Sequence, residues 1–106
     1  MSDPPTQVVN LHKEPYDVYI GRGQGSVWGN PFSHQGGTLA EFRVRTRWEA
    51  IYAYSQWILT QPELMARLPE LKGRTLGCFC KPRSCHGDVL ARLADSHNPF
   101  DLRGLT

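Results

Sequence analysis

The chain has 106 residues, 40% of them hydrophobic and 21% charged, which excludes a disordered or fibrous protein and allows one hydrophobic core but not two. Its net charge of +2 excludes a strong general attraction to nucleic acid or to an anionic membrane, so any anion binding must be local. Two sets of basic residues are candidates for a local patch: Arg43, Arg45 and Arg47 in one segment, and Arg22, Lys81 and Arg83 in two loops.

The number of cysteines and the first residues of the chain predict the cellular compartment. Three cysteines are an odd number, and Cys78 and Cys80 are separated by one residue of a predicted strand, so we expect reduced thiols. No apolar run approaches the roughly 18 residues that span a bilayer. Residues 1–5 lack the basic and apolar regions of a signal peptide. We therefore expect a cytoplasmic protein with no membrane partner.

The first half of the chain predicts two strands and a glycine-rich loop. Residues 7–11 and 17–20 have the composition of strands, and an initial hairpin is expected. Residues 21–26 contain three glycines, which allow amides to approach a ligand closely, but match no dinucleotide or Walker pattern. A ligand contact and a plain turn both remain open. Trp28 and Phe32 are predicted to be core residues, with Asn30 capping the turn between them (W-G-N-P-F).

The clearest helix begins near Thr46, because Thr46-Arg47-Trp48-Glu49 has the pattern of a capping box. An apolar stripe at three- and four-residue spacing then predicts the packed face: Trp48, Ile51, Tyr52, Ser55, Ile58 and Leu59. Packing is also expected for Trp57. A shorter helix is predicted over residues 62–68, and residues 38–45 are ambiguous between a strand and a helical turn.

Residues 75–80 predict a buried strand, followed by a short loop and a helix over residues 85–95 that Ser84 would cap. Val89, Leu90 and Leu93 would form the inner face of that helix. The order of elements predicts an α/β fold: a single small domain, 1–106, with a short mixed sheet covered by helices, Rossmann-like in type. Its core is expected over about residues 7–95, with tails at 1–6 and 96–106.

The residues most able to do chemistry surround the turn after the last predicted strand. Strand alternation places Cys78 and Cys80 on one side, and the loop returns to a helix start that holds Cys85 and His86. We therefore expect these four groups to lie close together, beyond the carboxyl end of a strand, where α/β sheets bind ligands.

Three interpretations of this cluster are open. The four residues would form a closed zinc site, although their spacing is not the usual paired C-x2-C. Alternatively, the helix start would make Cys85 a reactive thiolate, or would bind a phosphate or carboxylate beside Lys81 and Arg83. In the third interpretation, the cysteines are small buried hydrophobes and His86 is a capping or core-edge residue.

Two blocks of sequence carry a family resemblance. Residues 19–22 and the W-G-N-P-F segment form one block, and C-x-C-x-P-x-x-C-H-G-D within residues 77–90 forms the other. Together they resemble an uncharacterised family of bacterial and phage proteins, the domain of unknown function DUF4326, over about residues 8–95. The resemblance implies a small α/β domain whose two blocks converge on one site, and it supplies no reaction. Asn10, Gly21, Arg22 and Asn30 would then meet Cys78, Cys80, Cys85, His86 and Asp88.

The leading hypothesis is a site for a nucleotide-like or other phosphorylated ligand, extended by hydrolytic or glycosidic-transfer catalysis. The expected ligand-binding residues are Asn10, Gly21, Arg22, Asn30, Lys81 and Arg83. Cys85, His86 and Asp88 are the expected catalytic residues, with His86 or Asp88 as proton carrier. The alternative is a non-enzymatic interaction module, zinc-stabilised or plain, of the kind with which a phage binds a host factor or nucleic acid.

Overall fold

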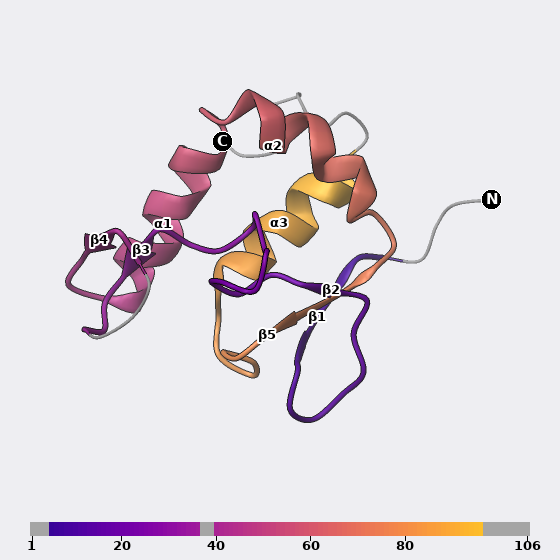
Figure 1. The fold of residues 1–106 in the computed structure, drawn as a ribbon, viewed down its shortest axis with the longest axis horizontal. Helices are drawn as coiled ribbons and strands as arrows, with labels where there is room; N and C mark the ends of the chain where they lie inside the picture. The colour runs from indigo at the N-terminus through magenta and orange to yellow at the C-terminus, as the bar shows by residue number, and fades with distance from the viewer. Residues whose placement is uncertain (1–4, 37–39, 97–106) are drawn as a thin grey trace.

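The computed structural model describes residues 5–36 and 40–96 (Figure 1). Its main sheet has three strands in the order β1-β5-β2: β1 (Gln7–Asn10), β5 (Thr75–Cys78) and β2 (Val18–Tyr19). Both outer strands run parallel to β5, and Val8 and Val18 align with Leu76 on its two sides. Parallel strands place their carboxyl ends at one edge, and this edge positions the site.

Two expectations about the sheet are wrong. The predicted hairpin is absent because β5 lies between β1 and β2, so the strands that are adjacent in sequence do not pair. The predicted mixed sheet is instead parallel in every pairing, including the two-residue strands β3 (Phe32–Ser33) and β4 (Phe42–Arg43). The buried β5 needs a partner on each side for its backbone groups, and this requirement explains its central place. Within residues 38–45, which were ambiguous between a strand and a helical turn, β4 is a strand. Residues 38 and 39 lie outside the described residues.

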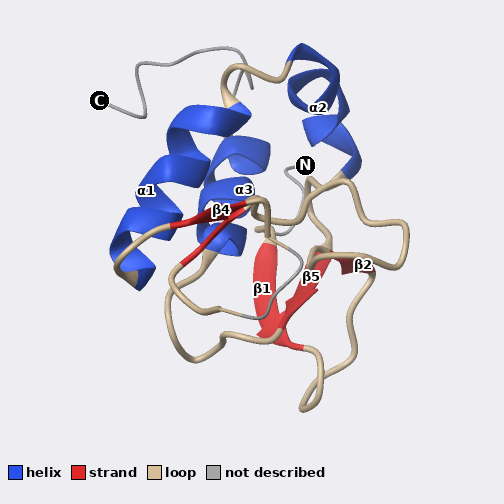
Figure 2. Ribbon diagram, turned by 60° about the vertical axis from the view of Figure 1, so that its left-hand side comes forward, coloured by secondary structure: helices blue, strands red, loops and turns tan. Residues whose placement is uncertain are grey.

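The helices gather on one side of the main sheet (Figure 2). They are α1 (Arg47–Ile58), α2 (Pro62–Arg67), which continues into a short 3-10 turn (Leu68–Glu70), and α3 (His86–Asp95). α3 lies against β1 and β5, and α1 packs on α3. The coarse prediction of a small α/β domain is confirmed. No helix of the described residues has the length and apolar character needed to cross a membrane.

The buried face of α1 differs from the predicted stripe. Ala50, Tyr54 and Ile58 are buried, whereas Trp48 is 72% and Tyr52 67% exposed. The small side chain of Ala50 lets the helix approach its neighbours, and the Ala50 carbonyl accepts a hydrogen bond from Asn30 Nδ2 at 3.1 Å. Ile58 belongs to the predicted stripe and is fully buried, but counting large apolar residues otherwise rotated the predicted face toward Trp48 and Tyr52 and away from Ala50 and Tyr54. Trp57 is partly buried against the core, as predicted.

The predicted inner face of α3 is confirmed, because Leu90 and Leu93 are fully buried and Val89 packs against the core. The helix begins one residue later than expected. Its N-cap is Cys85, whose Sγ accepts from Gly87 N, while the exposed Ser84 makes no cap. Extended backbone at residue 85 aims the Cys85 side chain at the first turn, in the position that serine usually takes.

The start of the fold is anchored to the end of α3. Thr6 is buried, and its N–H and hydroxyl both donate to the Asp95 carboxylate, the hydroxyl at 2.5 Å. Gly73 N donates to the same hydroxyl oxygen at 2.9 Å. Thr6 therefore belongs to the folded domain rather than to a tail. The other expected tail positions at 1–4 and 97–106 lie outside the described residues.

Candidate ligand-binding site

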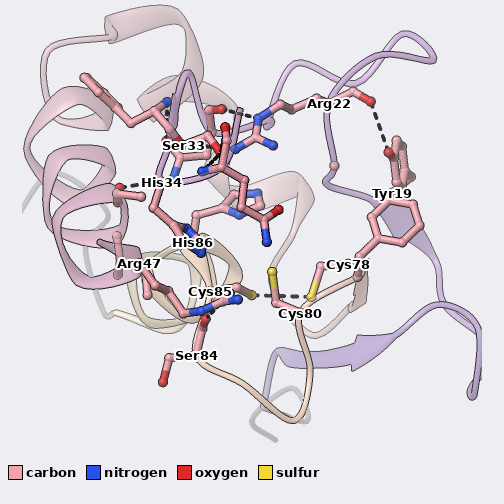
Figure 3. A pocket seen from close by; sticks show the side chains of 17 residues that line it. Tyr19, Arg22, Ser33, His34, Arg47, Cys78, Cys80, Ser84, Cys85 and His86 are labelled. Atoms are coloured by element: carbon pink, nitrogen blue, oxygen red, sulfur yellow. Dashed lines mark hydrogen bonds between the residues drawn. The ribbon is translucent and has the colours of Figure 1, made fainter. Parts of the chain in front are cut away.

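A cleft of about 360 Å³ opens where the strands of the main sheet end (Figure 3). Its walls come from the segments after β2 and β5, from the region around β3, and from the first turns of α1 and α3. The lining residues are Tyr19, Gly21, Arg22, Asn30, Phe32, Ser33, His34, Gln35, Arg47, Ala50, Ile51, Cys78, Phe79, Cys80, Ser84, Cys85 and His86. The location agrees with the general rule for parallel sheets.

The cleft brings together part of the predicted set. The predicted residues that line it are Gly21, Arg22, Asn30, Cys78, Cys80, Cys85 and His86. Four others are not part of its lining: Asn10, Lys81, Arg83 and Asp88. The two sequence blocks do meet in space, but the charged groups of the loop at residues 81–83 lie outside.

Three cysteine thiols gather in one wall. The Sγ atoms of Cys78 and Cys85 are 3.4 Å apart and both residues are buried, whereas Cys80 is only partly buried. Cys78 is the last residue of β5, a bend at Phe79 follows it, and the turn then returns Cys85 to Cys78. Cys80 lines the same cleft, and Figure 3 shows its side chain beside the other two. The expected clustering of the thiols is present.

Cys80 is the thiol of this cluster that ionises most readily. Hydrogen bonds from Cys78, Cys85 and the Arg47 guanidinium lower the pKa of Cys80, against an opposing effect of burial. The pKa of Cys85 is raised instead, because its thiol is bonded to Cys78 and Cys80 and is buried. The surroundings of Cys85 therefore do not support the expectation that the helix start lowers its pKa. The Gly87 N–H, 3.3 Å from Cys85 Sγ, favours the thiolate but is outweighed.

His86 does not complete a metal site with the thiols. Its Nε2 is 2.7 Å from the Ile20 carbonyl oxygen, and its ring meets the Tyr54 ring edge-on, with centroids 4.9 Å apart. Over residues 5–36 and 40–96, no group of three or more His, Cys, Asp and Glu side chains is arranged to hold a metal ion. The described residues thus give the four-ligand zinc interpretation no support. Burial lowers the pKa of His86, so the imidazole is neutral and poorly suited to the expected role of proton carrier.

Asp88 and Lys81 serve the turn rather than the cleft. Asp88 Oδ2 accepts from Cys85 N at 3.0 Å, which completes the capping box of α3. Its Oδ1 pairs with Lys81 Nζ at 2.6 Å. Both carboxylate oxygens are thus engaged within the turn, and Asp88 is not placed to carry a proton for a ligand in the cleft.

Asn10 and Arg83 also shape the loop after β5. Asn10 Nδ2 donates to the Lys81 carbonyl at 2.8 Å, so its amide holds the loop from the end of β1. Arg83 N donates to the Cys80 carbonyl at 2.7 Å in the tight turn, while Arg83 is exposed. Their predicted ligand-binding roles are not supported by their positions.

Arg22 and Asn30 form a rigid corner of the cleft. Arg22 Nε donates to the Asn30 carbonyl at 2.7 Å, and Nη2 to the Phe32 carbonyl at 3.0 Å. Asn30 is buried; its Oδ1 accepts from Phe32 N, and its Nδ2 donates to Ala50. The predicted turn-capping role of Asn30 is therefore confirmed, and both ends of its side-chain amide are hydrogen-bonded within the protein. Trp28 is buried in the core as predicted.

Arg47 is the main site residue that the sequence did not assign to the site. It was grouped with Arg43 and Arg45 as a separate basic segment, but it occupies the first position of α1, and its Nη1 donates to the Ser84 carbonyl at 3.4 Å. The start of α1 thus faces the turn between β5 and α3, a contact between segments 37 residues apart. Other lining residues were also missed: Tyr19, Ser33, His34, Gln35 and Phe79. The Thr46 cap predicted that Arg47 lies in the first turn of the helix. No local pattern indicated that Arg47 contacts the turn between β5 and α3.

These features define a small α/β domain with a cleft, lined by arginines and thiols, at the carboxyl edge of a parallel sheet. The chain belongs to the family described as a domain of unknown function (DUF4326), whose model matches residues 7–96, so the resemblance seen in the sequence is confirmed. One relative is a protein of Enterobacteria phage T4 described as an uncharacterized 12.4 kDa protein in the nrdA-td intergenic region. It is 34% identical over 89 residues, which cover 84% of this chain and 77% of that protein. No solved structure matches this chain.

Proposed function

We propose that the cleft binds a nucleotide-like or otherwise phosphorylated ligand. The observation that carries the proposal is the charge of the lining. Arg22 enters from the loop after β2 and Arg47 from the start of α1, and no Asp or Glu is among the described lining residues. Two guanidinium groups in a concave site favour an anion, and their planar donors suit phosphate oxygens.

Arg22 is held ready for such a ligand. Nε and Nη2 are fixed by the Asn30 and Phe32 carbonyls, so Arg22 loses little conformational entropy on binding. Nη1 has no hydrogen-bond partner among the described residues and is available to an oxygen of the ligand. The α3 start is less suitable, because Cys85 Sγ already accepts from Gly87 N. The phosphate is therefore assigned to the arginines rather than to the helix start.

The walls and volume suit the remainder of a nucleotide. Tyr19, Phe32 and Phe79 contribute ring surface on which a base stacks. A volume of about 360 Å³ lies in the usual range of small-molecule sites. The β1-β5-β2 order, with α3 directly after β5, supports a Rossmann-like relationship, in which ligands bind at this edge.

The proposal includes a hydrolytic or glycosidic-transfer reaction. Because His86 and Asp88 are committed to the fold, the proton carrier is assigned to His34, whose imidazole lines the cleft. A reaction of this class would appear as release of free base or free phosphate from the bound nucleotide.

The test is a binding screen by thermal unfolding, with inorganic phosphate, nucleosides and nucleoside mono-, di- and triphosphates. At least one phosphorylated compound should raise the melting temperature, and Arg47→Gln should weaken its binding about tenfold, which corresponds to about 1.4 kcal/mol. Arg83→Gln is the matched control: it removes an exposed arginine outside the cleft and should leave the affinity unchanged. Equal losses in both variants, or no compound that binds, would overturn the proposal.

A further inference from the structure

We propose that Cys80 is a nucleophile that reacts with hydroperoxides and that Cys85 resolves its oxidised form as a disulfide. The inference goes beyond the ligand proposal and does not depend on it. It rests on the arrangement of three thiols and one guanidinium in the wall of the cleft.

Access distinguishes the three cysteines. Cys78 and Cys85 are 1% and 2% exposed, whereas Cys80 is partly exposed and lines the cleft (Figure 3). A small reagent that enters the cleft therefore meets the sulfur of Cys80 first. The other two thiols lie behind it, 3.4 Å from each other.

The surroundings of Cys80 stabilise its thiolate. Cys78 and Cys85 present S–H donors to it, and Arg47 contributes both a hydrogen bond and a positive charge from the start of α1. The positive charge of Arg22, in the loop after β2, also interacts electrostatically with Cys80. The thiolate is the reactive form of cysteine, so this environment favours reaction at neutral pH.

The chemistry balances with a hydroperoxide as the oxidant. The Cys80 thiolate attacks the terminal oxygen of the peroxide; an S–O bond forms, the O–O bond breaks, and the alkoxide or hydroxide leaves and takes a proton from solvent. Cys85 sulfur, after losing its proton, then attacks the Cys80 sulfenic acid and displaces hydroxide, which leaves as water. In total, the two thiols lose two electrons and two protons and form one disulfide. The hydroperoxide gains both and yields an alcohol, or water from hydrogen peroxide, together with one further water.

Cys85 is the better partner for geometric reasons. Cys78 is buried at the end of β5, where Leu11 N donates to its carbonyl at 2.9 Å, so its backbone is held in the sheet and is not free to shift toward residue 80. Cys85 approaches from the far side of the turn as the N-cap of α3, and it lines the same cleft as Cys80. A bridge between residues 80 and 85 closes only the short loop between them.

Alkylation under limiting iodoacetamide tests the nucleophile. Peptide mapping should find Cys80 labelled first, with a rate that changes little between about pH 6 and pH 8. Arg47→Gln should slow this labelling about tenfold at the lower pH. Arg45→Gln, an exposed arginine of the same segment, should leave it unchanged. Faster labelling of Cys78 or Cys85, or reaction no faster than that of a free cysteine peptide, would overturn the proposal.

Treatment with one equivalent of hydrogen peroxide tests the resolving step. The native chain should lose two hydrogens and yield a peptide that joins residues 80 and 85, whereas Cys85→Ser should retain a sulfenic acid at Cys80 that dimedone traps. A bridge without Cys80, or a trapped sulfenic acid on the native chain with no disulfide, would overturn the assignment. Both experiments are run without nucleotide, so their failure leaves the ligand proposal standing. Arg47→Gln provides the test if cysteine variants fail to fold.

Discussion

The imidazole of His86 forms part of the wall of the cleft, yet its contacts belong to the fold. Its Nε2 lies against the Ile20 carbonyl, at the point where the chain leaves β2, and its ring rests on buried Tyr54. Tyr54 in turn donates its hydroxyl to the Trp28 carbonyl at 2.8 Å. His86 therefore links α3, α1 and the segment after β2, and the neutral imidazole is the form that fits there.

The protonation of His86 should make stability depend on pH. Burial lowers the pKa of His86 in the folded chain. As the pH falls, the unfolded chain therefore binds a proton at His86 before the folded chain does. The free energy of unfolding should be fully retained above about pH 6.5, the ordinary pKa of histidine, and should fall by up to about 1.4 kcal/mol per pH unit below it. Urea unfolding of the native chain and of His86→Gln at several pH values measures this. Equal slopes for both chains between about pH 7 and pH 5 would contradict the prediction.

At the scale of an element, the start of α3 is organised by a capping box built from Cys85 and Asp88. The cap orders the turn that presents the three thiols, because Cys85 contributes its sulfur to the first turn and its N–H to the Asp88 carboxylate. The pair between Lys81 and Asp88 adds a second tie, but both side chains are partly exposed. Exposed ion pairs contribute little, so the cap is the stronger contribution.

Two substitutions of Asp88 separate the cap from the ion pair. Asp88→Ala removes both and should lower the free energy of unfolding by about 1 kcal/mol or more. Asp88→Asn keeps an oxygen acceptor for Cys85 N and should cost clearly less, because it loses mainly the charge. Chemical denaturation of the two variants beside the native chain checks this order. Equal losses for Asp88→Asn and Asp88→Ala would show that the ion pair dominates and would contradict the prediction.

The helices could be predicted from the sequence better than the sheet and the cleft. Capping residues and local periodicity are short-range features, so the Thr46 cap and the Leu90 and Leu93 face of α3 were readable. The position of β5 between β1 and β2 depends on contacts between residues far apart in the sequence, which no local pattern predicts. The same applies to Arg47, which reaches the thiols only because α1 packs on α3. The thiols were found because one short turn carries all three.

For the whole molecule, the contact between Thr6 and Asp95 joins the first strand to the last helix. The two residues are 89 positions apart, and the Thr6 hydroxyl also accepts from Gly73 N. The network therefore holds the β1 edge of the sheet, the turn before β5 and the end of α3 in one place. It lies away from the cleft, since none of its members lines it.

Thr6→Val should destabilise the chain without changing the cleft. The substitution keeps the shape of the side chain but leaves Gly73 N and Asp95 without the hydroxyl, which should cost about 1–3 kcal/mol. Thr60→Val is the control: its exposed hydroxyl makes a local bond to the Trp57 carbonyl, and its loss should change stability by less than about 0.5 kcal/mol. Thermal unfolding and the rate of Cys80 alkylation measure both effects. A similar melting temperature for both variants would contradict the role of the network.

The walls of the cleft are divided between two halves of the chain. Every lining residue up to Ile51 precedes the break between α1 and α2, and every one from Cys78 onward follows it. Neither half alone therefore possesses a complete site, and recognition cannot begin before the halves have docked. A molecule that occupies the cleft would act as a bridge between them, and each increase in its concentration would make separation of the halves more costly.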